Sequence, residues 1–288
     1  ITAYGDVQMA VKAIKAGATD FVLKPWENEK LLATIYSSMR LRESRDQVQT
    51  LKTKNQEINQ SINEKYSDII GQSQAMLRIF QTIERVAQTD ANVLILGENG
   101  TGKELIARAI HRNSARKNES FVSVDLGSIT ETLFESELFG HKKGSFTDAK
   151  EDRPGRFELA NQGSLFLDEI GNLSMPLQAK LLTAIQNKRV SRVGSNKDTI
   201  IDLRLICATN MPLYEMVKEN RFRQDLLYRI NTIEIEIPPL RERIEDIPLL
   251  AQHFLKHYAS RYGKSVNKIR RSFLVQSEVI SICFFLFF

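Results

Sequence analysis

The most informative stretch of the chain is Gly97-Glu98-Asn99-Gly100-Thr101-Gly102-Lys103. An apolar run, Val93-Leu94-Ile95-Leu96, precedes it, and a helical pattern begins directly after it. A strand, a glycine-rich turn ending in lysine, and a helix together form a phosphate-binding loop. Backbone N–H groups, the helix N-terminus and Lys103 all direct positive charge at phosphate oxygens. The stretch therefore predicts a bound nucleoside triphosphate; taken alone, the motif also fits an ordinary strand-to-helix turn.

Two further apolar runs end in polar residues. Ser164-Leu165-Phe166-Leu167 leads into Asp168 and Glu169, and a second predicted strand, Leu203 to Ala208, leads into Asn210. Ligands of open α/β sheets bind at the carboxyl ends of the strands. There Asp168 is suited to hold Mg²⁺ through water, Glu169 to polarise the attacking water and Asn210 to contact the γ-phosphate. The alternatives are an acidic strand end for the two acids and an Asx turn or helix cap for Asn210.

Composition excludes several classes of protein. The 288 residues are 42% hydrophobic and 26% charged with a net charge of +5, as in a soluble globular protein that is only mildly basic. No Lys/Arg block resembles a DNA-binding arm. The two cysteines, Cys207 and Cys283, suggest no disulfide framework, and the apolar end from 279 to 288 is too short to span a bilayer. We expect a cytoplasmic protein that makes no membrane contact.

Strands and helices alternate between residues 67 and 240, which predicts an α/β domain with a parallel sheet and helices on both faces. A helix from 246 to 260 is expected to open a second, helical subdomain. Residues 1–40 predict a small α/β fragment that ends in a helix from Asn28 to Met39. Residues 41–66 predict a linker helix in which Leu41, Val48, Asn55 and Ile62 recur every seven positions. That seam fits a short dimerising coiled coil and a solvated spacer helix equally well.

The first 40 residues also carry a resemblance. Ile1-Thr2-Ala3-Tyr4, Ala13 to Phe21 and Leu23-Lys24-Pro25 resemble the second half of a response-regulator receiver domain. The resemblance implies that Thr2 and Lys24 contact an aspartyl phosphate whose acceptor lies before Ile1. It also implies a sensor histidine kinase as partner of the full receiver. A strand-end hydroxyl and a turn lysine are the simpler interpretation of these two residues.

Several longer motifs resemble the sigma-54-dependent transcriptional activators of the NtrC type. They are Gly97 to Lys103 followed by Glu104, Glu135-Ser136-Glu137-Leu138-Phe139-Gly140-His141, Pro154-Gly155-Arg156-Phe157-Glu158, Phe222 to Ile230 and Pro238-Pro239-Leu240-Arg241-Glu242-Arg243. The resemblance implies an AAA+ ATPase that uses ATP and Mg²⁺ to remodel RNA polymerase holding the sigma-54 factor. It places the nucleotide on the whole loop from Gly97 to Glu104 and on Ile70. Glu104 stands where other phosphate loops carry the Ser or Thr that ligates magnesium.

The family's sigma-54 contact loop corresponds to Gly144-Ser145-Phe146-Thr147-Asp148-Ala149. The resemblance implies that Phe146 and Thr147 contact sigma-54. An aromatic between glycine and threonine, with charged residues on either side, suits a contact loop, although it can also tuck under its own loop. Asp148 stands in place of a glycine of the family, which adds charge and removes backbone freedom.

Two arginines, Arg223 and Arg229, resemble trans-acting fingers that reach the γ-phosphate of a neighbouring copy. Such a shared site implies a hexamer-like ring; surface arginines paired with Asp225 are the alternative. The family's switch asparagine corresponds to Asp125, where a second carboxylate beside the catalytic glutamate would repel it unless one of the two is protonated or a cation intervenes.

The ends depart from the family pattern. Residues 241–270 predict the start of an incomplete helical lid, and residues 271–288 form an atypical apolar tail. We expect a chain truncated at both ends, in which DNA would be bound only through a C-terminal domain absent here. The main interpretation is the ATP-hydrolysing motor of a two-component activator. The alternatives are a nucleotide-gated binding module without turnover and another AAA+ remodelling ATPase.

Overall fold

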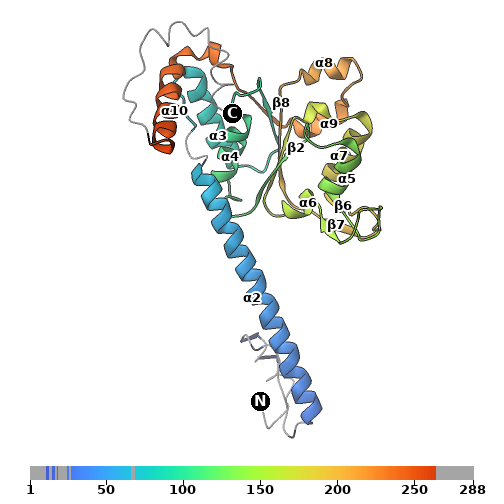
Figure 1. The fold of residues 1–288 in the computed structure, drawn as a ribbon. Helices are drawn as coiled ribbons and strands as arrows, with labels where there is room; N and C mark the ends of the chain where they lie inside the picture. Colours follow the sequence, from blue (N-terminus) through green and yellow to red (C-terminus); the bar gives the residue numbers. More distant parts are fainter. Residues whose placement is uncertain are drawn as a thin grey trace. The chain divides into compact units, whose positions relative to one another are not determined.

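The computed structural model describes residues 11–12, 15–16, 18, 25, 27–65 and 69–263 (Figure 1). The chain divides into two units, Ile1–Ile58 and Asn59–Phe288. The residues proposed as receiver contacts, Thr2 and Lys24, lie outside the described residues, as does the apolar tail.

The helix α2 runs without a break from Asn28 to Lys65 (Figure 1). The sequence predicted one helix to Met39 and a separate linker helix from residue 41, but the structure joins them. No glycine or proline stands between Asn28 and Lys65, so nothing in this stretch ends a helix.

The second unit is built on a five-stranded sheet in the order β2-β5-β8-β1-β9, and every pairing in it is parallel. Its strands are β1 (Val93–Leu96), β2 (Phe121–Asp125), β5 (Ser164–Asp168), β8 (Arg204–Thr209) and β9 (Ile233–Glu236). This confirms the predicted fold class. The three central strands are almost entirely buried, as expected for strands covered on both faces.

Helices cover the two faces of this sheet (Figure 1). On one face α3 (Gln74–Ala87) and α4 (Lys103–Arg112) pack against Val93, Ile95 and Phe166. On the other face Leu94 and Leu165 belong to a second core that includes residues of α5 (Glu131–Phe139), α7 (Met175–Asn187) and α9 (Gln224–Ile230). Successive residues of a strand point to opposite faces, so an unbroken apolar run serves both cores.

Shorter elements complete the unit. Two hairpins pair β3 (Gly140–His141) with β4 (Arg153–Pro154) and β6 (Arg189–Ser191) with β7 (Asp198–Ile200). The remaining elements are α6 (Arg156–Leu159), η1 (Ile170–Asn172), α8 (Leu213–Lys218), η2 (Leu240–Glu242), η3 (Ile244–Asp246) and α10 (Ile247–Arg261). The predicted helix from 246 to 260 corresponds to α10. Among the described residues, no helix has the length and apolar character needed to cross a membrane.

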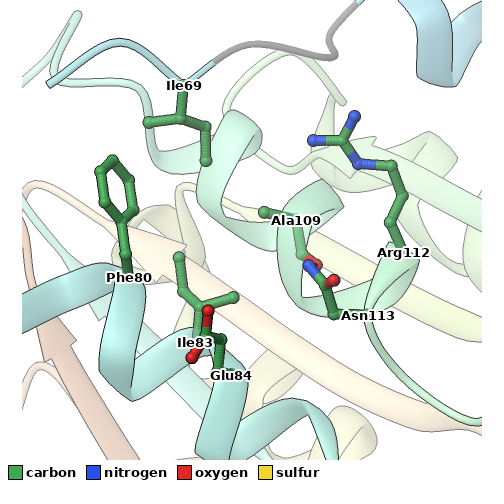
Figure 2. Close-up of a pocket in the computed structure, with 7 residues that line it drawn as sticks. All are labelled: Ile69, Phe80, Ile83, Glu84, Ala109, Arg112 and Asn113. Atoms are coloured by element: carbon green, nitrogen blue, oxygen red, sulfur yellow. The ribbon is translucent and has the colours of Figure 1, made fainter. Parts of the chain in front are cut away.

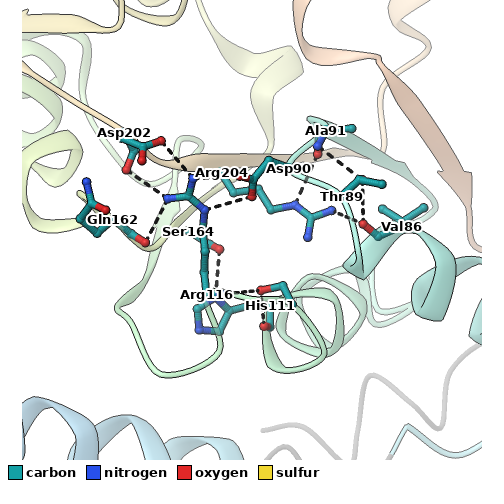
Figure 3. Close-up of polar contacts among 11 residues, drawn as sticks. Val86, Thr89, Asp90, Ala91, His111, Arg116, Gln162, Ser164, Asp202 and Arg204 are labelled. Carbon is teal, nitrogen blue, oxygen red and sulfur yellow. Dashed lines mark hydrogen bonds and ion pairs between the residues drawn. The ribbon is translucent and has the colours of Figure 1, made fainter.

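A network of polar contacts ties the amino ends of the strands together (Figure 3). Arg116 donates to both carboxylate oxygens of Asp90 at 3.0 and 3.1 Å, to Asp202 Oδ1 at 3.0 Å and to the carbonyl of Gln162 at 3.0 Å. These three partners precede β1, β8 and β5 respectively. One side chain after α4 therefore links the starts of three strands.

Candidate nucleotide-binding site

The phosphate loop lies between β1 and α4, as the motif predicts. Gly100 and Gly102 have φ values of 78° and 99°, in the left-handed region that favours glycine. A Cβ atom on Gly97 would lie 2.8 Å from Thr101 Oγ1 and 3.2 Å from the carbonyl oxygen of Ile237. The glycines are therefore required by backbone conformation at two positions and by close approach at a third.

Lys103 is the first residue of α4, and only 6% of it is exposed. Its Nζ donates to the carbonyls of Gly97 at 3.2 Å and Glu98 at 3.4 Å. The same Nζ lies 3.6 Å from Glu169 Oε1. A buried ammonium group needs such partners, and this one lies between the phosphate loop and the acids that follow β5. The structure thus brings the two predicted halves of the site together.

The two acids occupy the carboxyl end of β5. Asp168 is its last residue, and Glu169 follows with a φ of 55°, uncommon for a residue with a side chain. Asp168 Oδ1 accepts a hydrogen bond from the N–H of Glu169 at 2.9 Å. Burial raises the pKa of the Asp168 carboxyl, while that hydrogen bond and Lys103 oppose the rise. The left-handed backbone of Glu169 and the partly buried carboxyl of Asp168 distinguish these two acids from ordinary surface carboxylates.

Asn210 directly follows β8, the strand that lies between β1 and β5. Its Nδ2 donates to Asn99 Oδ1 in the phosphate loop at 2.9 Å. Asn210 therefore lies where the sequence expects it, next to the loop.

Three other residues singled out from the sequence have contacts that do not by themselves indicate a role in nucleotide binding. Glu104 accepts hydrogen bonds from Arg108, one turn further along α4, at 2.8 and 3.1 Å. Ile70 is half-buried in the segment before α3. Asp125 lies opposite Asp168 in the β2–β5 register, and its Oδ1 accepts from the N–H of Gly127 at 2.9 Å.

The two proposed finger arginines lie on or beside α9. Arg223 precedes the helix and pairs with Asp225 at 2.7 and 3.0 Å, which is the contact of the simpler alternative. Arg229 is exposed in the last turn of α9. A contact with a neighbouring copy stays a prediction for both.

The loop between β3 and β4 presents Phe146, which is 39% exposed. This ring and that of His141 form a T-shaped contact, with the ring centroids 4.9 Å apart and an interplanar angle of 69°. Thr147 and Asp148 beside it are exposed. Phe146 is thus partly packed on its own hairpin and partly free to contact a partner. His141 lies within a quoted family motif, but nothing in the local sequence pattern points to this contact.

An open pocket of about 270 Å³ lies between α3 and α4 (Figure 2). It is lined by Ile69, Phe80, Ile83, Glu84, Ala109, Arg112 and Asn113. This lining includes no residue of the phosphate loop and neither of the acids after β5. The pocket is separate from the candidate nucleotide site.

A lysine-tipped phosphate loop after β1, beside paired acids at the carboxyl end of β5 in a parallel sheet, defines a P-loop domain of the AAA+ type. Residues 69–236 match the family described as Sigma-54 interaction domain, and residues 241–276 match the AAA+ ATPase lid domain. The first match covers more than half of the chain, so the chain belongs to the sigma-54 interaction domain family. The resemblance stated from the motifs is confirmed.

Individual relatives agree with this assignment. The chain is 47% identical over 267 residues to the transcriptional regulatory protein ZraR of Escherichia coli (strain K12), a match that covers 93% of this chain and 58% of ZraR. It is 44% identical over 263 residues to the response regulator protein PilR of Pseudomonas aeruginosa, covering 91% of this chain and 56% of PilR. The chain thus spans less than two thirds of the length of these relatives.

The solved structures include NtrX from Brucella abortus in complex with ATP. That structure matches this chain with a TM-score of 0.70 at 34% sequence identity, covering 98% of this chain and 62% of NtrX. The same protein in complex with ADP matches with a TM-score of 0.70 at 33% identity, covering 98% of this chain and 61% of NtrX.

Proposed function

We propose that this chain binds ATP with Mg²⁺ and hydrolyses it as the motor of a sigma-54-dependent transcriptional activator. The observation that carries the proposal is the 3.6 Å approach of Lys103 Nζ to Glu169 Oε1, which joins the phosphate loop to the acids at the end of β5. Family membership and the ATP complex of NtrX support the same conclusion.

The carboxylates at the end of β5 fit a nucleotide bound together with Mg²⁺. No cluster of three or more His, Cys, Asp or Glu residues suited to a metal occurs in the described part of the chain. Mg²⁺ needs no such cluster, because one or two carboxylates, water and the substrate phosphates hold it. Asp168 is the residue that would hold the ion, through water. When bound, the ion neutralises charge on the phosphates.

The chain's own residues then have distinct tasks. The N–H groups of the loop from Gly97 to Glu104 bind phosphate oxygens, with Lys103 as the fixed positive charge beneath them. Glu169 accepts the proton of the attacking water, and Asn210 orients that water or the γ-phosphate. Ile70, in the segment before α3, belongs to the same nucleotide-binding set.

The proposed partners are those of the sigma-54 interaction domain family. Phe146 and Thr147 contact sigma-54, and Arg223 and Arg229 complete the site of a neighbouring copy in a hexamer-like ring. Arg223 must leave Asp225 to do so. The full receiver, with Thr2 and Lys24, would take its signal from a sensor histidine kinase. DNA binding would belong to a further domain, and the protein would act in the cytoplasm.

Replacing the proposed base tests the enzyme assignment. Glu169→Gln should bind fluorescently labelled ATP as the parent does, yet release phosphate about 10²- to 10⁴-fold more slowly, because no group accepts the water proton. Steady-state phosphate release measures the loss. Glu215→Gln, an exposed residue of α8, is the matched control and should leave both values unchanged. Turnover by Glu169→Gln equal to that of the parent would overturn the assigned base.

Replacing the exposed ring tests the partner. Phe146→Ala should abolish capture of purified sigma-54 in the presence of a transition-state nucleotide analogue, with phosphate release retained. Tyr262→Ala removes another exposed aromatic ring and should capture normally. Capture by Phe146→Ala at the parent level would contradict the proposed contact.

A further inference from the structure

A short segment, Leu240 to Asp246, connects β9 to α10 and touches the phosphate loop; we call it the strap. Arg241 of the strap donates two hydrogen bonds to the carboxylate of Glu98, from Nη1 to Oε2 at 2.8 Å and from Nη2 to Oε1 at 2.6 Å. This is the bidentate geometry that gives arginine–carboxylate pairs their directionality. Glu98 is the second residue of the phosphate loop, so the pair attaches the strap directly to it.

A second arginine of the strap reaches the same loop from within the core. Arg243 is 7% exposed, and its Nη2 donates to the carbonyl oxygen of Thr101 at 3.1 Å. Thr101 in turn donates from its N–H at 3.3 Å and from Oγ1 at 2.8 Å to the carbonyl of Glu98. Arg241 and Arg243 therefore hold the two ends of one turn of the loop.

The far end of the strap is anchored to the start of α3. Asp246 is fully buried, and its Oδ1 accepts from the N–H groups of Gln72 at 2.6 Å and Ser73 at 2.8 Å. Its Oδ2 accepts from the hydroxyl of Ser73 at 2.8 Å. The lid helix α10 begins at the next residue, Ile247. The strap is thus the joint at which the lid, the phosphate loop and the segment after Ile70 meet.

We propose that Arg241 is a positioning residue which, together with Arg243, sets the shape of the phosphate loop for ATP. This inference rests on the proposed function of the site. The loop binds phosphate through N–H groups whose directions depend on its backbone, and two of its residues are glycines in left-handed conformations. Contacts from outside the loop lower the entropic cost of ordering it when nucleotide binds.

An inert surface ion pair is the competing explanation. The side chains of Arg241 and Glu98 are 51% and 55% exposed, and pairs this exposed add little to folding stability. Variants of either residue should therefore fold and unfold as the parent does. A positioning role shows instead in ATP affinity, which an inert pair would leave unchanged.

A double-mutant cycle on the full chain separates the two explanations. We expect Arg241→Gln and Glu98→Gln each to weaken binding of fluorescently labelled ATP, in the presence of Mg²⁺, by about three- to fivefold. The double variant should be no weaker than the poorer single variant, because either change releases the loop. All three should keep the parent's unfolding temperature without nucleotide.

Other outcomes overturn the inference. Single losses that multiply in the double variant, or affinities equal to the parent's, would show that the pair does not act on the loop. Tighter binding by Glu98→Gln would show that Glu98 only repels the triphosphate. Arg85→Gln, an exposed arginine bonded within α3, is the control and should bind normally. A parent chain that fails to bind labelled ATP refutes the proposed function as well, whereas a binding parent with unaffected variants refutes this inference alone.

Discussion

The two edges of the central sheet use charged residues in opposite ways. At the carboxyl edge, where the strands end, Lys103 makes long contacts of 3.2 to 3.6 Å with two carbonyls and with Glu169. At the amino edge, where the strands begin, Arg116 makes bonds of 3.0 and 3.1 Å to Asp90 and one of 3.0 Å to Asp202 (Figure 3). The long contacts of Lys103 leave its ammonium group able to bind a ligand, whereas the guanidinium of Arg116 is already paired with two carboxylates.

The same contrast appears in protonation and backbone geometry. At the carboxyl edge burial raises the pKa of Asp168, and Glu169 has a left-handed backbone. At the amino edge the hydrogen bonds from Arg116 hold the pKa of Asp90 below its usual value. The left-handed backbone of Glu169 and the raised pKa of Asp168 thus contrast with the paired Arg116 and Asp90 at the opposite edge. Changes at the carboxyl edge should therefore alter binding, and changes at the amino edge should alter stability.

The largest effect is expected for ATP binding when Lys103 at the carboxyl edge is replaced. Lys103→Ala should weaken binding of labelled ATP about 100-fold, since a hydrogen bond to a charged group contributes up to roughly 3 kcal/mol. Its unfolding temperature should stay within a few degrees of the parent's, because the lysine has no short bond to lose. Lys180→Ala, an exposed lysine of α7, is the control. Unchanged affinity, or loss of the fold, would contradict the contrast between the edges.

The next prediction concerns the pH dependence of stability caused by His111 at the amino edge. His111 is buried at the end of α4, and its Nδ1 lies 2.9 Å from Ser164 Oγ. Burial lowers the pKa of His111 to about 4, with a smaller contribution from Arg108, Arg204 and Arg112, against the carbonyl of Glu119. Between about pH 6.5 and pH 4 the unfolded chain binds a proton that the folded chain does not.

The free energy of unfolding should therefore decrease as the pH is lowered through that window. The total decrease is about 3 kcal/mol, at roughly 1.4 kcal/mol per pKa unit. The contribution is fully present above pH 6.5. Urea unfolding of the parent and of His111→Gln from pH 7 to 4 measures it, and the variant should lack this part of the slope. His257→Gln replaces an exposed histidine and should keep the parent's slope. Equal slopes for parent and His111→Gln would refute the assignment.

The parts of the fold that depend on local pattern were predictable. The strand β1 has its predicted ends, and β8 is displaced by one residue from the predicted Leu203 to Ala208. An apolar run bounded by polar residues marks a strand buried on both faces, and the phosphate-loop motif orders its neighbours. Lys103, Glu169 and Asn210 could be placed together for the same reason, since parallel strands end at one edge.

Contacts between distant residues were not predictable. Asp90, Arg116 and Asp202 meet at the amino edge without any periodic signal, because each stands alone in a loop. Arg241 was part of a recognised motif, yet only the fold shows that it bonds Glu98, 143 residues away. Sequence patterns report which residues face a core, whereas charged pairs depend on how the loops are arranged.

The smallest effect on stability is expected for Arg204, a second buried arginine at the amino edge. Arg204 is fully buried at the start of β8, where Nη2 donates to the carbonyl of Val86 at 2.8 Å and Nε to that of Ala91 at 3.4 Å. Its Nη1 is buried without a hydrogen-bond partner among the described residues, and burial lowers the pKa of this arginine. Its charge is therefore only partly compensated, unlike that of Arg116.

Arg204→Met should change the free energy of unfolding by no more than about 1 kcal/mol. The carbonyl of Val86 keeps the hydrogen bonds that it accepts from the N–H and the hydroxyl of Thr89. Losing the bond from the charged guanidinium costs about 1.5–3 kcal/mol, and removing a poorly compensated buried charge offsets that cost. Arg116→Met is the matched comparison and should lose more, because it leaves the carboxylates of Asp90 and Asp202 without their shared partner. Urea unfolding of both variants at pH 7 provides the ranking. An Arg204→Met loss as large as that of Arg116→Met would show that the charge of Arg204 is compensated as well as that of Arg116.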